Sequence, residues 1–369
     1  MLRARWRYLT NQAIATRLLR FVLPVRLRRK NPGSRSHALE EMSSRNQYPV
    51  FVVGSARSGN TLLYHMLLAS GLFPPYRSEP VVFDLLVPRS GDLSRRANRE
   101  RLLKIWVQSK QFRVSGLDPE EFAERVLSTC RSGGDFLRLM MDSVAERHGC
   151  KRWAVWGPDN LLHMDLIKRE IPEALFLHVI RDGRDVAYSL ARSGFIRPLP
   201  WERKGGLLVS GSHWMWKTKR GRRLGQRLSG DYLEVRYESL ARDPEATLGR
   251  VSSFIGEELS YPSIRDSSLG TISNPNSSFQ EEIEAGFDPV GRWRKNLTEA
   301  ELERLEALLG RFLEELDYPL ESSNRSWRTV VGMRALDLFY RNVFTMKEWA
   351  KMHTPLGRFV ATGRLVLGT

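Results

Sequence analysis

The 369-residue chain has little cysteine and no uninterrupted apolar segment long enough to anchor it in a membrane. Its two cysteines, Cys130 and Cys150, stand in no spacing typical of a zinc or redox site. A reducing compartment fits them best, with a single disulfide left open. Residues 10–30 could form a basic helix, but Arg17 and Arg20 interrupt its apolar residues, which argues against a spanning helix or a signal-peptide core. With 41% hydrophobic residues and no repeats, the chain can bury a full core.

The central part also lacks a charge excess, although the whole chain carries a formal net charge of +16. Residues 1–49 carry 11 basic and two acidic residues, and residues 325–369 carry eight and two, whereas residues 50–324 carry 39 and 38. The excess therefore lies at the two ends. These ends are expected to contact an anionic membrane peripherally. The alternatives are a solvated arm or a helix packed on the body for the N-terminal end, and a helical hairpin on the body for the C-terminal end. Neither end has the interleaved aromatic and basic residues of a single-stranded nucleic-acid groove, so nucleic acid is not an expected partner.

This distribution divides the chain into a basic arm (1–48), a body (49–320) and a basic amphipathic tail (321–369). Short apolar runs in the body predict four strands, at residues 49–54, 153–156, 174–180 and 231–235. Amphipathic stretches predict helices between them, near residues 61–71, 119–130, 135–147, 160–169, 184–193, 213–228 and 244–256.

Alternating strands and helices predict an α/β fold: a three-layer sandwich with a mostly parallel central sheet, plus helical terminal extensions. Ligands of such sheets bind at the carboxyl ends of the strands. Thr298 followed by Glu301 predicts the capped start of a late helix. The region 72–118 is rich in Pro, Ser and Arg and is expected to carry loops over the active site.

The chain has a glycine loop of the phosphate-binding type that lacks the usual Lys. Residues 54–61 read Gly-Ser-Ala-Arg-Ser-Gly-Asn-Thr, which is the P-loop spacing with Asn60 in the place of Lys. A predicted strand precedes the loop and a predicted helix follows it, so the arrangement is P-loop NTPase-like. Backbone N–H groups and the positive end of the helix would surround an anion. The usual Lys partner of a nucleoside triphosphate is absent, and Arg57 remains as the cation of the loop.

A second anion site is predicted where the strand at 174–180 runs into the Arg-Asp-Gly-Arg-Asp sequence of residues 181–185. Arg181, at the carboxyl end of a strand, can bind a phosphate through two hydrogen bonds, and Ser189 could add a hydroxyl. The alternative is a capped turn in which the two aspartates neutralise the two arginines. Two such sites on neighbouring strands favour one ligand with two phosphate-like ends.

Four segments together resemble the sulfotransferase family that uses 3′-phosphoadenosine-5′-phosphosulfate (PAPS). Residues 54–63 resemble the family's 5′-phosphosulfate loop, and residues 179–190 resemble its 3′-phosphate motif. Residues 235–245 are similar to its strand-end Tyr with the following helix, and residues 291–298 to the C-terminal segment that closes on the nucleotide. They occur in the order expected for the family, between residues 49 and 318, and the ends of the chain lie outside the resemblance.

The resemblance implies that PAPS binds without a metal ion. Its expected contacts are Arg57, Ser58, Gly59, Asn60, Thr61, Arg181, Ser189, Tyr237, Arg292 and Trp293. A sulfuryl group bears less charge than a terminal phosphoryl group, so neither Mg²⁺ nor the P-loop Lys is needed to offset it. Arg57 is therefore expected to stabilise the leaving phosphate as well as to bind it. Packing roles remain the alternative for Tyr237, Arg292 and Trp293.

An acceptor hydroxyl needs a base, and Glu79 is the first choice. It follows the first helix, as the catalytic Glu does in one branch of the family, which includes the protein-tyrosine and many bacterial and carbohydrate enzymes. The alternative is a surface carboxylate paired with Arg77. Asp159 and His163 are second choices. Bacterial relatives commonly carry a Lys before the nearby Pro, and this chain has Trp156 and a glycine there.

These features predict a cytoplasmic sulfotransferase, also expected at the membrane periphery, that moves a sulfuryl group from PAPS to a hydroxyl or amine acceptor. A glycan, a lipid and a small hydroxyl compound all remain open as acceptors. The alternative enzyme is a nucleotide-dependent kinase or NTPase, which needs a Lys at position 60 and an acidic Mg²⁺ ligand. A non-catalytic adaptor with the same fold is a third possibility. The presence of Arg57, Thr61, Glu79, Arg181 and Ser189 together argues against the adaptor.

Overall fold

A computed structural model of the chain describes residues 45–194, 196–199, 206–228, 230–267, 289–322, 326–359 and 365. Apart from its last four residues, the predicted arm 1–48 lies outside the described residues, and so does the basic helix considered within residues 10–30. The division into an arm, a body and a tail stays a prediction.

The core of the fold is a four-stranded parallel sheet in the order β2-β1-β3-β4. The strands are β1 (Val50–Gly54), β2 (Ala154–Trp156), β3 (Leu175–Ile180) and β4 (Tyr232–Arg236). Val52 of β1 lies opposite Trp156 of β2 on one side and Leu177 of β3 on the other. Each predicted strand is confirmed to within one residue at both ends, and the predicted α/β class is correct.

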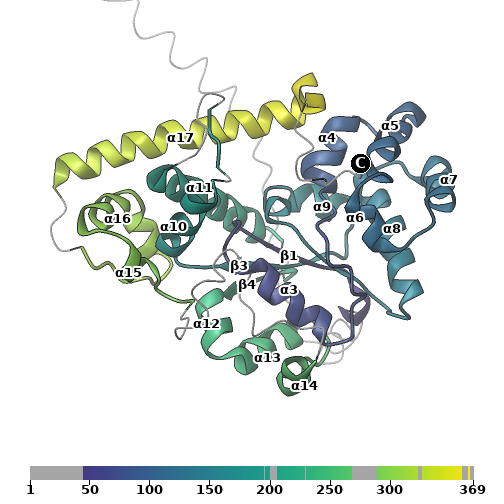
Figure 1. The fold of residues 1–369 in the computed structure, drawn as a ribbon, viewed down its shortest axis with the longest axis horizontal. Coiled ribbons are helices and arrows are strands. Elements are labelled where there is room, and N and C mark those ends of the chain that lie inside the picture. The colour runs from purple at the N-terminus through teal and green to yellow at the C-terminus, as the bar shows by residue number, and fades with distance from the viewer. Residues whose placement is uncertain are drawn as a thin grey trace, which may run out of the picture. The chain divides into compact units, whose positions relative to one another are not determined.

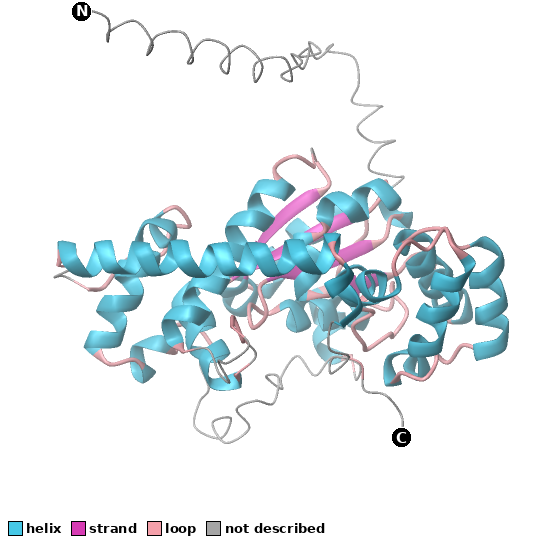
Figure 2. Ribbon diagram, turned by 90° about the horizontal axis from the view of Figure 1, so that it is seen from above, coloured by secondary structure: helices cyan, strands magenta, loops and turns pink. Residues whose placement is uncertain are grey.

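Helices cover both faces of this sheet, which gives the predicted three layers (Figures 1 and 2). One face packs on α3 (Asn60–Ala69), α12 (Tyr237–Arg242), α13 (Pro244–Ile255) and α14 (Tyr261–Asp266). The other packs on α9 (Met164–Glu170), α10 (Gly183–Ser193) and α11 (Leu207–Gly225), and α16 (Glu299–Glu314) packs on α10 and α11. Thr298 and Glu301 cap α16 reciprocally, as their spacing predicts.

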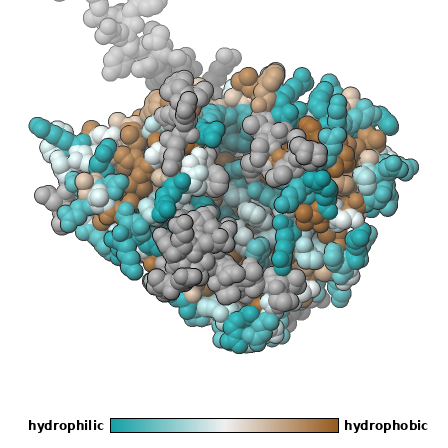
Figure 3. Space-filling view, viewed as in Figure 1, coloured by the Kyte–Doolittle hydropathy of each residue, from teal (hydrophilic) through white to brown (hydrophobic). Residues whose placement is uncertain are grey.

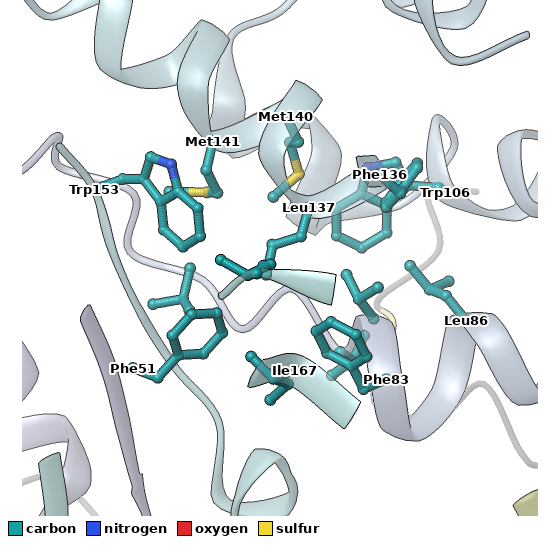
Figure 4. Packing of buried hydrophobic residues seen from close by; sticks show 14 of the residues in the cluster. Phe51, Phe83, Leu86, Trp106, Phe136, Leu137, Met140, Met141, Trp153 and Ile167 are labelled. Atoms are coloured by element: carbon teal, nitrogen blue, oxygen red, sulfur yellow. The ribbon is translucent and has the colours of Figure 1, made fainter. Parts of the chain in front are cut away.

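The region 72–118 is largely helical, which corrects the expectation that it carries loops. It contains η3 (Val82–Leu86), α4 (Val87–Ser90), α5 (Arg96–Trp106) and α6 (Lys110–Ser115), followed by α7 (Pro119–Thr129) and α8 (Gly133–Arg147). Leu86 and Trp106 are fully buried in the same core as Phe51 of β1 (Figure 4). Tertiary burial of these apolar side chains outweighs the loop-like composition between them.

The C-terminal tail forms one long helix, α17 (Trp327–His353), followed by the turn η6 (Pro355–Phe359). α17 packs against α11 and α16, so the alternative of a helical hairpin is wrong for the described residues. The remaining short elements are η2 (Arg45–Gln47), η4 (Pro158–Leu162) and α15 (Trp293–Asn296). Within the described ranges, no helix has the length and apolar character needed to cross a bilayer. Cys130 and Cys150 are both free thiols.

Candidate active site

The glycine loop connects β1 to α3 at the carboxyl edge of the sheet. Arg57 (φ 68°) and Gly59 (φ 100°) adopt left-handed backbone conformations, which bend the chain around a concave turn. The Ser58 N–H donates to the carbonyl of Ser55 (3.2 Å) within this turn, and contact of Ser58 with the phosphosulfate stays a prediction. The N–H groups at the start of α3 have no intrahelical partners, so they remain suited to an anion.

Asn60 points back into the loop. Its side-chain amide donates to the carbonyl of Ser55 (3.0 Å) and, more weakly, to that of Gly54 (3.4 Å), and the residue is 4% exposed. The side chain that replaces the P-loop Lys therefore braces the loop from inside. Such a brace leaves the cationic role to other residues.

Two close approaches fix the loop against its neighbours. A Cβ on Gly54 would lie 2.5 Å from the carbonyl oxygen of Val179 in β3, so only glycine fits there. A Cβ on Gly59 would lie 2.2 Å from the ring of Tyr237, at the start of α12. Tyr237 is thus packed directly on the loop, and its expected contact with the nucleotide stays a prediction.

Three arginines converge on the loop. Arg57 donates through Nε to the hydroxyl of Ser189 on α10 (2.9 Å). Arg181 donates to the carbonyl of Arg57 (3.3 Å), and its guanidinium lies 4.5 Å from the Tyr237 ring centre. Burial, together with the charges of Arg181 and Arg292, lowers the pKa of Arg57. Like charges gathered in this way favour a bound anion.

Arg181 also holds the segment that precedes α15. It donates to the carbonyl of Pro289 (2.5 Å) and pairs with Asp185 (3.4 Å), whose carboxylate accepts from the N–H groups of Gly291 (2.9 Å) and Trp293 (3.0 Å). The Nε of Arg181 is buried and has no hydrogen-bond partner in the described part of the chain. The arginine therefore retains a donor although Asp185 offsets part of its charge. The pairing with Asp185 is the one expected of a capped turn, and phosphate binding by Arg181 stays a prediction.

A buried network joins α10 to the C-terminal half of the body. Arg184 pairs with Asp182 (2.8 Å) and with Glu306 of α16 (2.6 Å), and all three residues are at most 6% exposed. The Trp293 ring lies 3.9 Å from the Arg184 guanidinium, and its indole N–H donates to Asp182 (3.2 Å). Trp293 is 1% exposed, so its observed role is packing, and contact with a nucleotide stays a prediction.

Glu79 lies at the carboxyl edge of β2. A Cβ on Gly157, the residue after β2, would be 3.3 Å from its carboxylate oxygen Oε1. The preceding segment is fixed because the hydroxyl of Tyr64, on α3, donates to the carbonyl of Tyr76 (2.5 Å). The structure thus brings Glu79 to the edge that carries the glycine loop, and its role as base stays a prediction.

The second-choice bases face α11 and α17. Asp159 forms an ion pair with Lys217, a side chain on α11 that is almost fully buried. His163 lies 3.3 Å from Glu348 of α17, but burial lowers the pKa of His163 to about 4, so the imidazole is neutral at pH 7. Lys217 was not among the predicted site residues. A lysine within a continuous helical pattern, 58 residues from its partner, gives no local signal of this contact.

No group of three or more His, Cys, Asp or Glu side chains in the described ranges is placed to hold a metal ion. The donors at the loop suit an anion instead: arginine guanidinium groups, the N-terminus of α3, and the buried hydroxyls of Ser55 and Ser58, which have no partner among the described residues. The arrangement fits a ligand that carries negative charge at two neighbouring strand ends.

Comparison with solved structures returned several sulfotransferases. The sulfotransferase domain of the Synechococcus PCC 7002 olefin synthase has a TM-score of 0.49 and 18% identity over 78% of this chain and 94% of that one. The sulfotransferase domain from the curacin biosynthetic pathway has a TM-score of 0.44 and 15% identity over 74% and 98%. Retinol dehydratase, solved with androsterone and the inactive cofactor PAP, has a TM-score of 0.34 and 17% identity over 77% and 87%.

A search of curated protein sequences returned no significant match. The sequence model of the Sulfotransferase family, in contrast, matches residues 49–261, which is more than half of the chain and includes all four strands, the glycine loop and Arg181. The chain therefore belongs to the sulfotransferase family of enzymes.

Proposed function

We propose that the enzyme transfers a sulfuryl group from PAPS to an acceptor hydroxyl or amine. One observation carries this proposal: Arg57, Arg181 and Arg292 converge on a glycine loop in which Asn60 takes the place of the P-loop Lys. Arg57 therefore lies within the loop and Arg181 at the end of the next strand, which suits a phosphosulfate and a separate 3′-phosphate. A kinase or NTPase lacks support because the Lys that contacts its nucleotide is replaced by a brace.

In this proposal the residues of the chain bind and neutralise charge. Arg57 and the first N–H groups of α3 would hold the 5′-phosphosulfate, and Arg57 would stabilise charge that develops on the leaving phosphate. Arg181 and Ser189 would bind the 3′-phosphate from the carboxyl end of β3 and from α10. Tyr237 and Arg292 would contact the nucleotide near Arg181. When bound, PAPS supplies the sulfuryl group itself.

Glu79 would accept the proton of the acceptor hydroxyl. Its carboxylate lies next to Gly157 at the carboxyl edge, on the β2 side of the glycine loop, opposite Arg181 on the β3 side. A base in this position would act from the side of the loop that the 3′-phosphate does not occupy. General-base catalysis of this kind contributes about 10²–10⁴-fold to rate.

The acceptor class is proposed as a glycan, a lipid or a small hydroxyl compound. The basic residues of the two chain ends favour an acceptor that is anionic or carried by a membrane, and contact of these ends with an anionic membrane is part of the proposal. A cytoplasmic location at the membrane periphery stays a prediction.

The proposal is tested by incubating the enzyme with PAPS carrying labelled sulfate and a panel of glycans, lipids and phenols, read by mass spectrometry. With the best acceptor, Glu79→Gln should lower kcat by about 10²–10⁴-fold and leave the affinity for 3′,5′-adenosine bisphosphate unchanged. Glu100→Gln, which removes an exposed carboxylate paired with Arg96 on α5, is the matched control and should change neither value. Full activity of Glu79→Gln would disprove its role as base but not the donor assignment.

A further inference from the structure

α17 is apolar on two opposite sides, and only one of them packs on the body. Its inner side adds Leu336, Tyr340 and Phe344 to the core formed with α11 and α16. Its outer side and the following turn η6 expose eight large hydrophobic residues: Trp327, Val331, Leu338, Phe339, Met346, Trp349, Leu356 and Phe359. We call these eight side chains the outer apolar face. Figure 1 shows α17 along one side of the body, and hydrophobic residues reach the surface along the same margin in Figure 3.

The outer apolar face is concentrated and not a scatter of single residues. It contains eight of the nine exposed large hydrophobic side chains of the described residues, and the ninth is Val114 on α6. Trp327 and Met346 are each 70% exposed, and Phe359 is 80% exposed. The α17 members recur at spacings that keep them on one side of the helix. A surface on which exposed apolar side chains gather in this way marks an interaction site.

The charges of α17 have one sign on its exposed surface. Arg328, Arg334, Arg341 and Lys347 are exposed. The two acidic residues of the helix are partly buried, and one of them, Glu348, faces His163, the residue between η4 and α9. The exposed charged side chains of α17 are therefore all cations.

We propose that the outer apolar face docks on the surface of an anionic lipid bilayer, with α17 lying in the plane of the interface. Aromatic residues with polar edges, Trp327 and Trp349, stand near the two ends of the helix, and Trp prefers the membrane–water interface. The flanking cations match anionic headgroups. A helix of 27 residues is about 40 Å long, so it offers an extended line of contact.

The same charges disfavour two other occupants of this face. A second copy of the chain, packed face to face, would bring the arginines of two α17 helices together. The segment 1–44 carries ten basic and two acidic residues, so it has the same sign as α17. An anionic bilayer is complementary to both.

Docking would bring the catalytic edge close to the membrane. The inner side of α17 contacts the end of η4, the segment that follows β2, because Glu348 lies beside His163, the residue after η4. It contacts α11 through Thr345 and Trp216 (3.0 Å). The bilayer surface would thus lie about one helix diameter, roughly 10 Å, from η4. This placement favours an acceptor carried by the membrane, a step that rests on the proposed function.

Cosedimentation of the full chain with vesicles tests the docking. The wild-type protein should sediment with vesicles of phosphatidylcholine and phosphatidylserine (70:30) but not with phosphatidylcholine alone, and 0.5 M NaCl should weaken the binding. The triple variant Trp327→Ser, Met346→Ser and Trp349→Ser should lower the partition coefficient at least about tenfold, since each side chain removes apolar surface from the interface. Val114→Ser removes an exposed apolar side chain elsewhere and should bind as wild type does.

Binding of 3′,5′-adenosine bisphosphate, measured on the same proteins, keeps the two proposals separate. The triple variant should bind it as wild type does, which also shows that the variant is folded. The docking is overturned if the wild-type protein stays in the supernatant, or if the triple variant sediments equally, since segment 1–44 would then account for the attraction. It is also overturned if, without vesicles, the wild type is a dimer and the triple variant a monomer, because the face would then join two copies.

Discussion

At the scale of single residues, the side chain at position 60 decides what the glycine loop can hold. The Asn60 amide fills the inside of the loop and donates to two of its carbonyl groups, whereas a P-loop Lys extends toward phosphates. The cationic role is left to Arg57, which has an unusual left-handed backbone conformation and contacts α10 through Ser189.

Asn60→Lys, which restores the P-loop sequence, should therefore destabilise the protein and should not create ATP binding. The loss of the amide donor in a buried site should lower the free energy of unfolding by about 1–3 kcal/mol, measured by urea denaturation. Asn342→Lys, at an exposed position of α17, should stay within about 0.5 kcal/mol of wild type. Stabilisation of Asn60→Lys by Mg-ATP would contradict this account of the loop.

Arg57→Gln should weaken binding of 3′,5′-adenosine bisphosphate by roughly tenfold to a hundredfold, because a charge-assisted hydrogen bond contributes about 1.5–3 kcal/mol. Isothermal titration calorimetry measures this directly. Arg250→Gln, at an exposed position of α13, is the control and should bind as wild type does. An unchanged affinity in Arg57→Gln would mean that Arg57 only holds the loop to Ser189.

Sequence patterns predicted some of these residues and not others. The loop, Arg181 and Tyr237 stand at the ends of apolar runs, so the sequence places them at one sheet edge, and the structure brings them together. The Asp159–Lys217 pair and the burial of Trp293 depend on how α11 and α15 pack, and no local pattern encodes that packing.

At the scale of elements, the network around Arg184 fixes α10, α15 and α16 to one another. Arg184→Met should lower the free energy of unfolding by about 3–5 kcal/mol, since it leaves Asp182 and Glu306 buried without their partner. Arg311→Met removes an exposed arginine paired with Glu315 and should cost at most about 1 kcal/mol. Equal losses in the two variants, measured by urea denaturation, would contradict a structural role for the network.

Strands and helices could be predicted from the sequence where their buried residues form a regular apolar pattern along the chain. The strands are short apolar runs in a sheet covered on both faces, and such runs stand out in any sequence. The helices of the region 72–118 were not predicted, because their buried residues are separated by Pro, Ser and Arg and are united only by the core around Phe51.

At the scale of the whole molecule, buried histidines make stability depend on pH. Burial lowers the pKa of His163 to about 4 and those of His178 and His213 to about 3. An unfolded histidine has a pKa of about 6.5, so below that pH the unfolded chain binds more protons than the folded one. The free energy of unfolding should therefore fall as pH decreases from about 6.5 to 4, by up to about 1.4 kcal/mol per pH unit for each histidine.

Urea denaturation between pH 4.5 and 7.5 measures this slope. His213→Phe, in a site where the ring already contacts Trp216 and Phe344, should reduce it by the contribution of one histidine. His148→Gln, at an exposed position, should leave it unchanged. A stability that stays constant or rises on acidification would contradict neutral burial of the three rings.

The central claim is that this loop and its arginines bind an adenosine carrying phosphates at both its 3′ and 5′ positions. Thermal unfolding of the full chain with 3′,5′-adenosine bisphosphate or with Mg-ATP tests it most directly. The account predicts a higher Tm with the bisphosphate, by several degrees at a hundredfold excess over Kd, and no change with Mg-ATP. A higher Tm with Mg-ATP and none with the bisphosphate would contradict it.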